Sequence, residues 1–171
     1  TYNISYLKKY LPDTPVRLIH LVQREQGLMV KKGNPKQIDG IADLSRKKVS
    51  FINRQIGSGT RILLDYKLDQ LNIKATEING YQNEEFTHMA VAVSVLSGTA
   101  DAGLGIYAAA KALDLDFIPV VTEQYDLVVL PEFFTSDAVQ ILFDIINSSD
   151  FKQRVETLGG YNTKNTGKVI L

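Results

Sequence analysis

A short turn rich in glycine, Gly57–Thr60 (Gly-Ser-Gly-Thr), most constrains how this 171-residue chain can fold. An apolar, β-prone segment, Val49–Ile52, comes just before it, and Leu64, Leu68 and Leu71 follow it at helical spacing. The sequence therefore predicts a strand, a tight turn and the first turn of a helix. Strands also alternate with helices along the rest of the chain, so the predicted class is α/β with a largely parallel sheet.

The chemistry of this turn favours an anion site. A strand-to-helix turn leaves backbone N–H groups unpaired beside the positive end of the helix dipole. Gly57 and Gly59 let the backbone approach a ligand closely, while Ser58 and Thr60 add hydroxyl donors. The alternative is an ordinary helix capped by Thr60. The turn lacks the Gly-Lys-Ser/Thr of a P-loop and the G-x-G-x-x-G spacing, so it does not indicate nucleotide binding.

The charge balance of the chain argues against several classes of function. Lys plus Arg and Asp plus Glu both number 19, so the formal net charge is zero, and direct contact with nucleic acid is not expected. The absence of cysteine excludes disulfides and thiol catalysis, and the two histidines, His20 and His88, are too far apart for a zinc motif. No apolar run approaches the length of a membrane span. We therefore expect no metal, no cofactor and no insertion into a membrane.

The remaining elements are predicted from apolar spacing and turn residues. Strands are expected at residues 16–22, 26–30, 101–106, 117–121 and 127–130, and helices at 4–10, 107–113, 135–146 and 150–158. A further helix is expected to begin at Glu84 and to end before Gly98. The apolar residues that share one face of this helix are Phe86, Met89, Ala90, Val93 and Leu96.

Three stretches carry a resemblance to a known family. They are residues 53–61 (Asn-Arg-Gln-x-Gly-Ser-Gly-Thr-Arg), residues 85–92 (Glu-Phe-Thr-His-x-Ala-Val-Ala) and residues 98–106 (Gly-x-Ala-Asp-Ala-Gly-x-Gly-Ile). In this order they resemble the periplasmic-binding-protein-like domain, of the type II solute-binding-protein kind, that is fused to molybdopterin biosynthesis proteins and helix-turn-helix regulators. That family is related to the binding proteins for molybdate and tungstate. The resemblance runs from about residue 2 to about residue 160.

The resemblance implies two α/β lobes with mostly parallel sheets, joined by crossing strands, with ligand in the cleft between them and closure about a hinge. Residues 1–33 would form a remnant of lobe 1 and the first crossing strand, 34–116 lobe 2, and 117–171 the return crossing strand with the C-terminal helices of lobe 1. The βαβ units that open lobe 1 in the family are missing, so lobe 1 is expected to be incomplete. The chain also begins without a methionine or signal peptide, so we expect a mature form or an excised part of a longer polypeptide with an N-terminal segment.

The ligand-binding residues that we predict combine the turn with positions carried by the resemblance. They are Gly57, Ser58, Gly59, Thr60, Arg61, Thr87, His88, Gly105, Ile106 and Tyr125. Alternatives stay open for two of them, because Arg61 could lie on a solvated helix face and His88 could be a packing residue. Asp101 would repel an oxyanion and is expected to be structural, and Glu123 could pair with Arg24 and lock the hinge.

The predicted function is the binding or sensing of a small anion similar to molybdate or tungstate. The alternatives are a biosynthetic domain of the molybdopterin pathway that contacts a pterin phosphate, and a receptor that delivers an anion to a permease. We predict no enzyme, because no serine is followed by plausible partners and the G-x-S-x-G form is missing. Apolar faces in residues 1–23 and 131–158 predict a homodimer. A cytoplasmic location is favoured over an extracytoplasmic one.

Overall fold

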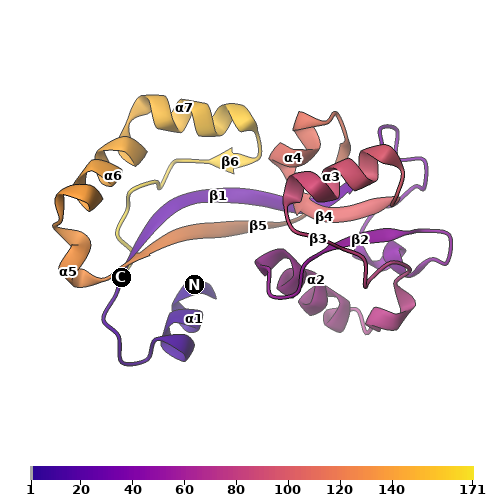
Figure 1. Cartoon of the computed structure of the whole chain (residues 1–171), viewed down its shortest axis with the longest axis horizontal. Coiled ribbons are helices and arrows are strands. Elements are labelled where there is room, and N and C mark those ends of the chain that lie inside the picture. Colours follow the sequence, from indigo (N-terminus) through magenta and orange to yellow (C-terminus); the bar gives the residue numbers. More distant parts are fainter. Residues whose placement is uncertain (1) are drawn as a thin grey trace. The chain divides into compact units, whose positions relative to one another are not determined.

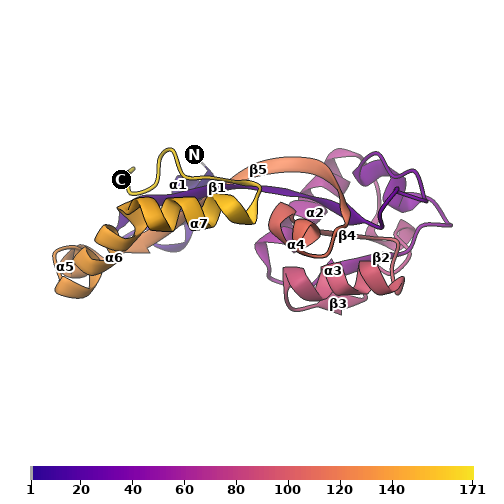
Figure 2. The same cartoon turned by 90° about the horizontal axis from the view of Figure 1, so that it is seen from above.

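The computed structural model describes residues 2–171, with only the backbone described for Tyr2, and it divides into two compact units. Unit 1 comprises Thr1–Arg24 and Glu123–Leu171, and unit 2 comprises Glu25–Thr122. Two long strands, β1 (Arg17–Val30) and β5 (Asp116–Val129), each contribute residues to both units and are drawn as unbroken ribbons (Figure 1, Figure 2).

Each of these long strands replaces two shorter strands that the sequence predicted. The polar residues that were expected to interrupt them are instead paired with one another inside unit 1. Arg24 forms an ion pair with Glu123, as one sequence alternative proposed, and its guanidinium carbon lies 4.6 Å from the centre of the Tyr125 ring. Because the strands are only half-buried at these positions, polar side chains can remain there without ending the strand.

The sheet of unit 2 is organised around β2 (Phe51–Arg54), which pairs in parallel with β3 (Glu84–Glu85) and with β4 (Ala102–Ile106). Strand β4 pairs antiparallel with β1, and the spatial order is β3-β2-β4-β1-β5. The predicted α/β class with parallel strands is confirmed, and the antiparallel β1 is an addition to it.

Side chains alternate between the two faces of this sheet and form two buried apolar clusters. The first cluster lies against α2 (Gly59–Gln70) and the short 3₁₀ helix η1 (Ile41–Ser45), with η2 (Ala75–Glu77) nearby in sequence. The second lies against α3 (His88–Ser97) and α4 (Tyr107–Ala112). In unit 2, helices therefore cover both faces, with α3 and α4 above β4 and α2 below β2 in Figure 1.

The helix expected at Glu84 begins later, at His88, and that prediction was wrong. Glu84 and Glu85 pair with β2 as strand β3, and Thr87 caps the helix by accepting a hydrogen bond from the Ala90 amide. Helix α3 carries apolar residues on both sides, so spacing alone did not decide which side faces the sheet. The buried side is Val91, Ala92 and Val95, whereas Phe86, Met89, Val93 and Leu96 are exposed.

Unit 1 contains α1 (Tyr2–Tyr10), α5 (Pro131–Phe134), α6 (Asp137–Asn147), α7 (Ser149–Leu158) and β6 (Tyr161–Asn162), with β6 paired to β1. A buried polar cluster ties α1 to β1 and β5. Asp126 accepts a hydrogen bond of 2.7 Å from the Asn3 amide, and its other oxygen lies 2.8 Å from His20 Nδ1.

Helix α6 leaves much of its apolar surface uncovered. Ile141 is 58% exposed and Ile145, one turn later, is 52% exposed, while Ile146 is buried. Among the residues that the structure describes, both buried apolar clusters belong to unit 2. Unit 1 therefore has far less apolar packing of its own than unit 2.

Asp101 joins the N-terminal ends of β2 and β4, as expected for a structural acid. One carboxylate oxygen accepts hydrogen bonds of 2.8 Å from both the amide and the hydroxyl of Ser50, and Lys36 Nζ lies 3.7 Å from the other. Burial alone would raise the pKa of Asp101, but these hydrogen bonds and the Lys36 ammonium outweigh it and hold the pKa below its ordinary value of 3.8.

We predict that Asp101→Asn lowers the free energy of unfolding by about 1–2 kcal/mol at pH 7, because charge-assisted hydrogen bonds are lost. A depressed folded-state pKa stabilises the fold above the unfolded-state pKa, and this stabilisation is lost as the pH falls through the folded-state value. The difference between variant and parent should therefore shrink below about pH 4 in urea titrations at several pH values. A difference that stays constant down to pH 2 would contradict this assignment.

Candidate functional site

The segments that carry most of the predicted residues leave one edge of the sheet of unit 2. Strands β2, β3 and β4 are parallel, so their carboxyl ends, at Arg54, Glu85 and Ile106, lie on the same edge. The Gln55 amide donates to the Glu85 carbonyl at 3.1 Å, which shows that the first two segments stay in contact beyond their strands. Ligands of α/β folds bind beyond the carboxyl ends of parallel strands, so this edge is the candidate site.

The Gly-rich turn forms the strand-to-helix junction that the sequence predicted, with a different capping residue. Ser58, and not Thr60, is the N-cap of α2, because its hydroxyl accepts a hydrogen bond of 3.2 Å from the Arg61 amide. Gly57 has φ +88°, a backbone conformation that favours glycine. Gly59 has ordinary helical geometry, so the turn needs glycine for its backbone conformation at position 57 only.

Two backbone amides at the start of α2 have no partner. Among residues 2–171, neither the Gly59 nor the Thr60 N–H donates a hydrogen bond, whereas the next two amides, of Arg61 and Ile62, bond to Ser58. A Cβ built on Gly57 or Gly59 would meet no atom within 4 Å, so the turn borders open space. Two free donors at the positive end of a 12-residue helix form a surface suited to an anion.

The Thr60 side chain is turned away from this open space. Its hydroxyl donates a hydrogen bond of 2.8 Å to Gln26 Oε1, and the two residues are only 4% and 1% exposed. Gln26 lies on β1, opposite Ile106 of β4. Sequence reasoning missed Gln26. Its one signal was a polar residue at the start of the buried apolar run Gly27–Val30.

The Arg61 guanidinium is bound by groups of the protein itself. Arg61 is 4% exposed, lies 3.2 Å from Glu84 Oε1 and donates to the Arg54 carbonyl at 3.1 Å. Its guanidinium carbon lies 4.0 Å from the centre of the Tyr81 ring, and burial raises the pKa of Tyr81, whose hydroxyl donates to Asp65. Arg61 is neither solvated nor aimed at the open space, so we do not propose it as a ligand contact.

The other predicted positions of unit 2 lie on the neighbouring segments. The Thr87 hydroxyl oxygen caps α3 by accepting a 3.0 Å hydrogen bond from the Ala90 amide. His88 lies beside β4, because its Nδ1 is 3.5 Å from the place that a Cβ on Gly105 would take. Ile106 is the N-cap residue of α4. Nine predicted residues therefore belong to unit 2, and Tyr125 belongs to unit 1, where it contacts Arg24.

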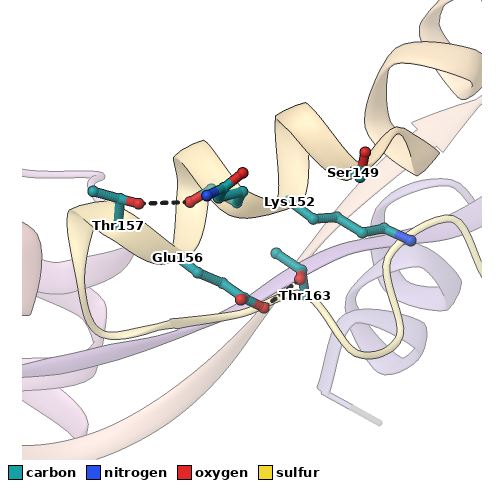
Figure 3. Close-up of a pocket in the computed structure, with 6 residues that line it drawn as sticks. Ser149, Lys152, Glu156, Thr157 and Thr163 are labelled. Atoms are coloured by element: carbon teal, nitrogen blue, oxygen red, sulfur yellow. Dashed lines mark hydrogen bonds between the residues drawn. The ribbon is translucent and has the colours of Figure 1, made fainter.

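A hollow on unit 1 offers a less suitable site. It encloses about 630 Å³ and is lined by Ser149, Lys152, Gln153, Glu156, Thr157 and Thr163. Figure 3 shows the Glu156 and Thr163 side chains pointing toward each other, and the Thr163 hydroxyl donates to Glu156 at 2.5 Å. The Thr157 hydroxyl donates to the Gln153 carbonyl at 2.8 Å. Both hydroxyls are therefore already bonded to groups of the protein itself.

The part of the chain that the structure describes offers neither a cluster of metal-binding side chains nor a helix that could span a membrane. Residues 2–171 hold no cluster of three or more acidic, histidine or cysteine side chains that could bind a metal ion. The helices formed by the same residues are too short or too polar to cross a membrane.

The sequence is similar to one described family and to two curated relatives. Residues 1–147 match the family described as the PBP superfamily domain. The protein YvgK of Bacillus subtilis (strain 168) is 45% identical over 170 residues, which are 99% of this chain and 54% of YvgK. A Clostridium pasteurianum protein from the 5′ region of a 2Fe-2S ferredoxin gene is 41% identical over 110 residues, 64% of this chain and 97% of that protein. The chain thus spans about half the length of YvgK.

Two solved structures with a similar fold share less than 20% identity with this chain. The substrate-binding domain described for a molybdenum ABC transporter of Clostridium difficile has a TM-score of 0.59 and 19% identity, over 94% of this chain and 72% of that domain. PEB3 of Campylobacter jejuni with bound L-phospholactate has a TM-score of 0.57 and 18% identity, over 85% of this chain and 68% of PEB3. These likenesses support the fold alone.

The capping role of Ser58 leads to a test of the local geometry. Ser58→Ala should lower the free energy of unfolding by about 1 kcal/mol, because the Arg61 amide loses its acceptor. Ser58→Asn, which keeps an acceptor of similar reach, should stay within about 0.5 kcal/mol of the parent. Equal urea midpoints for Ser58→Ala and the parent would show that another residue caps α2.

Proposed function

The chain belongs to the PBP superfamily of domains, and we propose that its unit 2 binds a small oxyanion at the N-terminus of α2. The observation that carries this proposal is the pair of amides without a partner, of Gly59 and Thr60, at the carboxyl edge of the sheet and beside a turn that borders open space at Gly57 and Gly59. The Ser58 hydroxyl can add a third donor, since its oxygen accepts from Arg61 and its proton remains available.

This donor set suits a negatively charged ligand that is held without a cation. The Arg61 guanidinium already faces Glu84 and the Arg54 guanidinium donates to the Phe86 carbonyl, so the charge on a bound anion would be balanced chiefly by backbone dipoles. Neutral donors also agree with a chain whose formal net charge is zero. We propose molybdate or tungstate as the first ligands to test, because the fold resembles a substrate-binding domain described for a molybdenum transporter.

We propose a binding role and not a catalytic one. The Ser58 hydroxyl caps α2 and the Thr60 hydroxyl is bonded to Gln26, so among the described residues neither is paired with a general base. A domain that contacts a pterin phosphate, or a receptor for an anion permease, would use the same amides. Affinity for a phosphate ester well above the affinity for molybdate would favour the domain that contacts a pterin phosphate.

We predict that molybdate, tungstate or sulfate binds the unaltered chain in titration calorimetry and that two substitutions in the turn weaken or abolish this binding. Gly59→Val should weaken it at least about tenfold, because a side chain there enters the open space in front of the amides, where a Cβ meets no neighbour. Ser58→Asp keeps a helix cap but places a carboxylate beside the anion, so binding should be lost while stability is kept.

Urea unfolding of both variants serves as the control for folding. The proposal fails if the unaltered chain binds none of these anions, or if both variants bind with the affinity of the parent while remaining folded.

We also infer that a second copy of the chain covers the apolar face of α6. Ile141 and Ile145 lie one helical turn apart and are both more than half exposed, in a unit with little apolar packing of its own. Exposed apolar patches of this kind on soluble proteins commonly mark interfaces, and a two-fold dimer is the commonest closed arrangement.

We therefore expect the 171-residue chain to sediment as a dimer at low micromolar concentration. Ile145→Glu should shift it to monomer, because a charge would be buried in the apolar contact. Val93→Glu is the matched control, since Val93 is similarly exposed but lies on α3 of unit 2. A monomeric parent, or dissociation by Val93→Glu and not by Ile145→Glu, would contradict the inference.

A further inference from the structure

We propose that Gln26 is a positioning residue of the anion site, acting through Thr60 on the first turn of α2. The proposal rests on the function proposed above, and it adds strand β1 to the parts that build the site. Its basis is a single buried side-chain hydrogen bond, 2.8 Å long, from the Thr60 hydroxyl to Gln26 Oε1.

The bond is well placed to fix the free amides. Ser58 is the N-cap, so Gly59 and Thr60 are the first two helical residues, and they are the two whose amides lack partners. Thr60 therefore carries both a free amide and, on the same residue, the side-chain bond to β1. Rotation of this first turn would move both amides away from the edge of the sheet.

The partner of this bond is itself firmly held. Gln26 is 1% exposed and lies opposite Ile106 in the antiparallel pairing of β1 with β4. Ile106 ends β4 at the same edge where β2 leads into the Gly-rich turn. On the other side of the same turn, the Arg61 guanidinium bonds to the Arg54 carbonyl of β2 and to Glu84 of β3, so Gln26 supplies the link to β1. The bond from the Arg61 amide to Ser58 is internal to the helix and does not fix how the helix is placed on the sheet.

A purely structural role predicts a different pattern of mutant effects. If the bond only satisfies two buried polar groups, stability and affinity should rise and fall together. Removing one partner leaves a buried polar atom unpaired, whereas replacing both partners by apolar groups of similar shape can be nearly neutral for stability. A double variant can therefore restore stability without restoring the bond that positions the amides.

The variants that separate the two roles are Gln26→Met, Thr60→Val and their combination, with Thr60→Ser as the conservative control. Thr60→Ser keeps the hydroxyl, so its affinity for molybdate should stay within about twofold of the parent. Each single apolar variant should lower the urea midpoint. The double variant should regain most of the parent's midpoint and yet bind molybdate about tenfold more weakly, because the first turn of α2 is no longer bonded to β1.

Titration calorimetry with molybdate, alongside urea unfolding of each variant, gives the required readouts. Weak binding by a stable double variant, with parental binding by Thr60→Ser, supports the positioning role. Parental affinity in the stable double variant overturns that role and leaves the proposed anion site intact. Failure of the unaltered chain to bind molybdate, tungstate or sulfate overturns both, so the two failures can be told apart.

Discussion

The candidate site depends on the parallel pairing of β2 with strands on both of its sides. Because β3 and β4 run in the same direction as β2, the three segments that follow them leave the sheet at one edge. The Gly-rich turn, the entry to α3 and the entry to α4 are thereby gathered from residues some 50 positions apart in the sequence. Without this pairing the free amides of α2 would have no neighbours with which to form a site.

Around the strands of this sheet, charged and neutral groups have separate roles. Charged side chains such as Arg61 and Asp101 are bonded to other groups of the protein. Arg61 faces Glu84, and Asp101 holds Ser50 at the opposite end of β2 and β4. The amides of Gly59 and Thr60, which have no partner, are neutral donors that would bind an anion through dipoles and without a permanent counter-charge. This division explains how a chain of zero net charge can present a surface suited to an anion.

Local features of the site could be predicted from the sequence, because they depend on neighbouring residues. The strand, turn and helix around Gly57–Thr60 followed from apolar spacing and from glycine placement. The capping residue did not follow, since Ser58 and Thr60 are both good N-caps and only the backbone geometry at the turn distinguishes them. The later start of α3 was missed for a related reason, because Glu84 and Glu85 become a strand only through pairing with β2.

Contacts between distant segments could not be predicted in this way. Gln26 and Thr60 are 34 positions apart, and nothing in either local pattern indicates that they share a hydrogen bond. The sequence predicted each of the two long strands as two shorter ones for the same reason. Arg24, Glu123 and Tyr125 interrupt the apolar pattern, but in unit 1 Arg24 contacts both of the other two residues. The side of α3 that faces the sheet likewise depends on β2 and β4, because the helix is apolar on both sides.

The central claim is that an oxyanion is bound by the free amides of Gly59 and Thr60, and the most direct test is a ¹⁵N–¹H correlation spectrum recorded during titration with molybdate. The account predicts saturable shifts that are largest for these two amides, with smaller shifts at His88 and across Gly57 and Ser58. Unchanged Gly59 and Thr60 resonances at saturating molybdate, or saturable shifts confined to residues of unit 1, would contradict it.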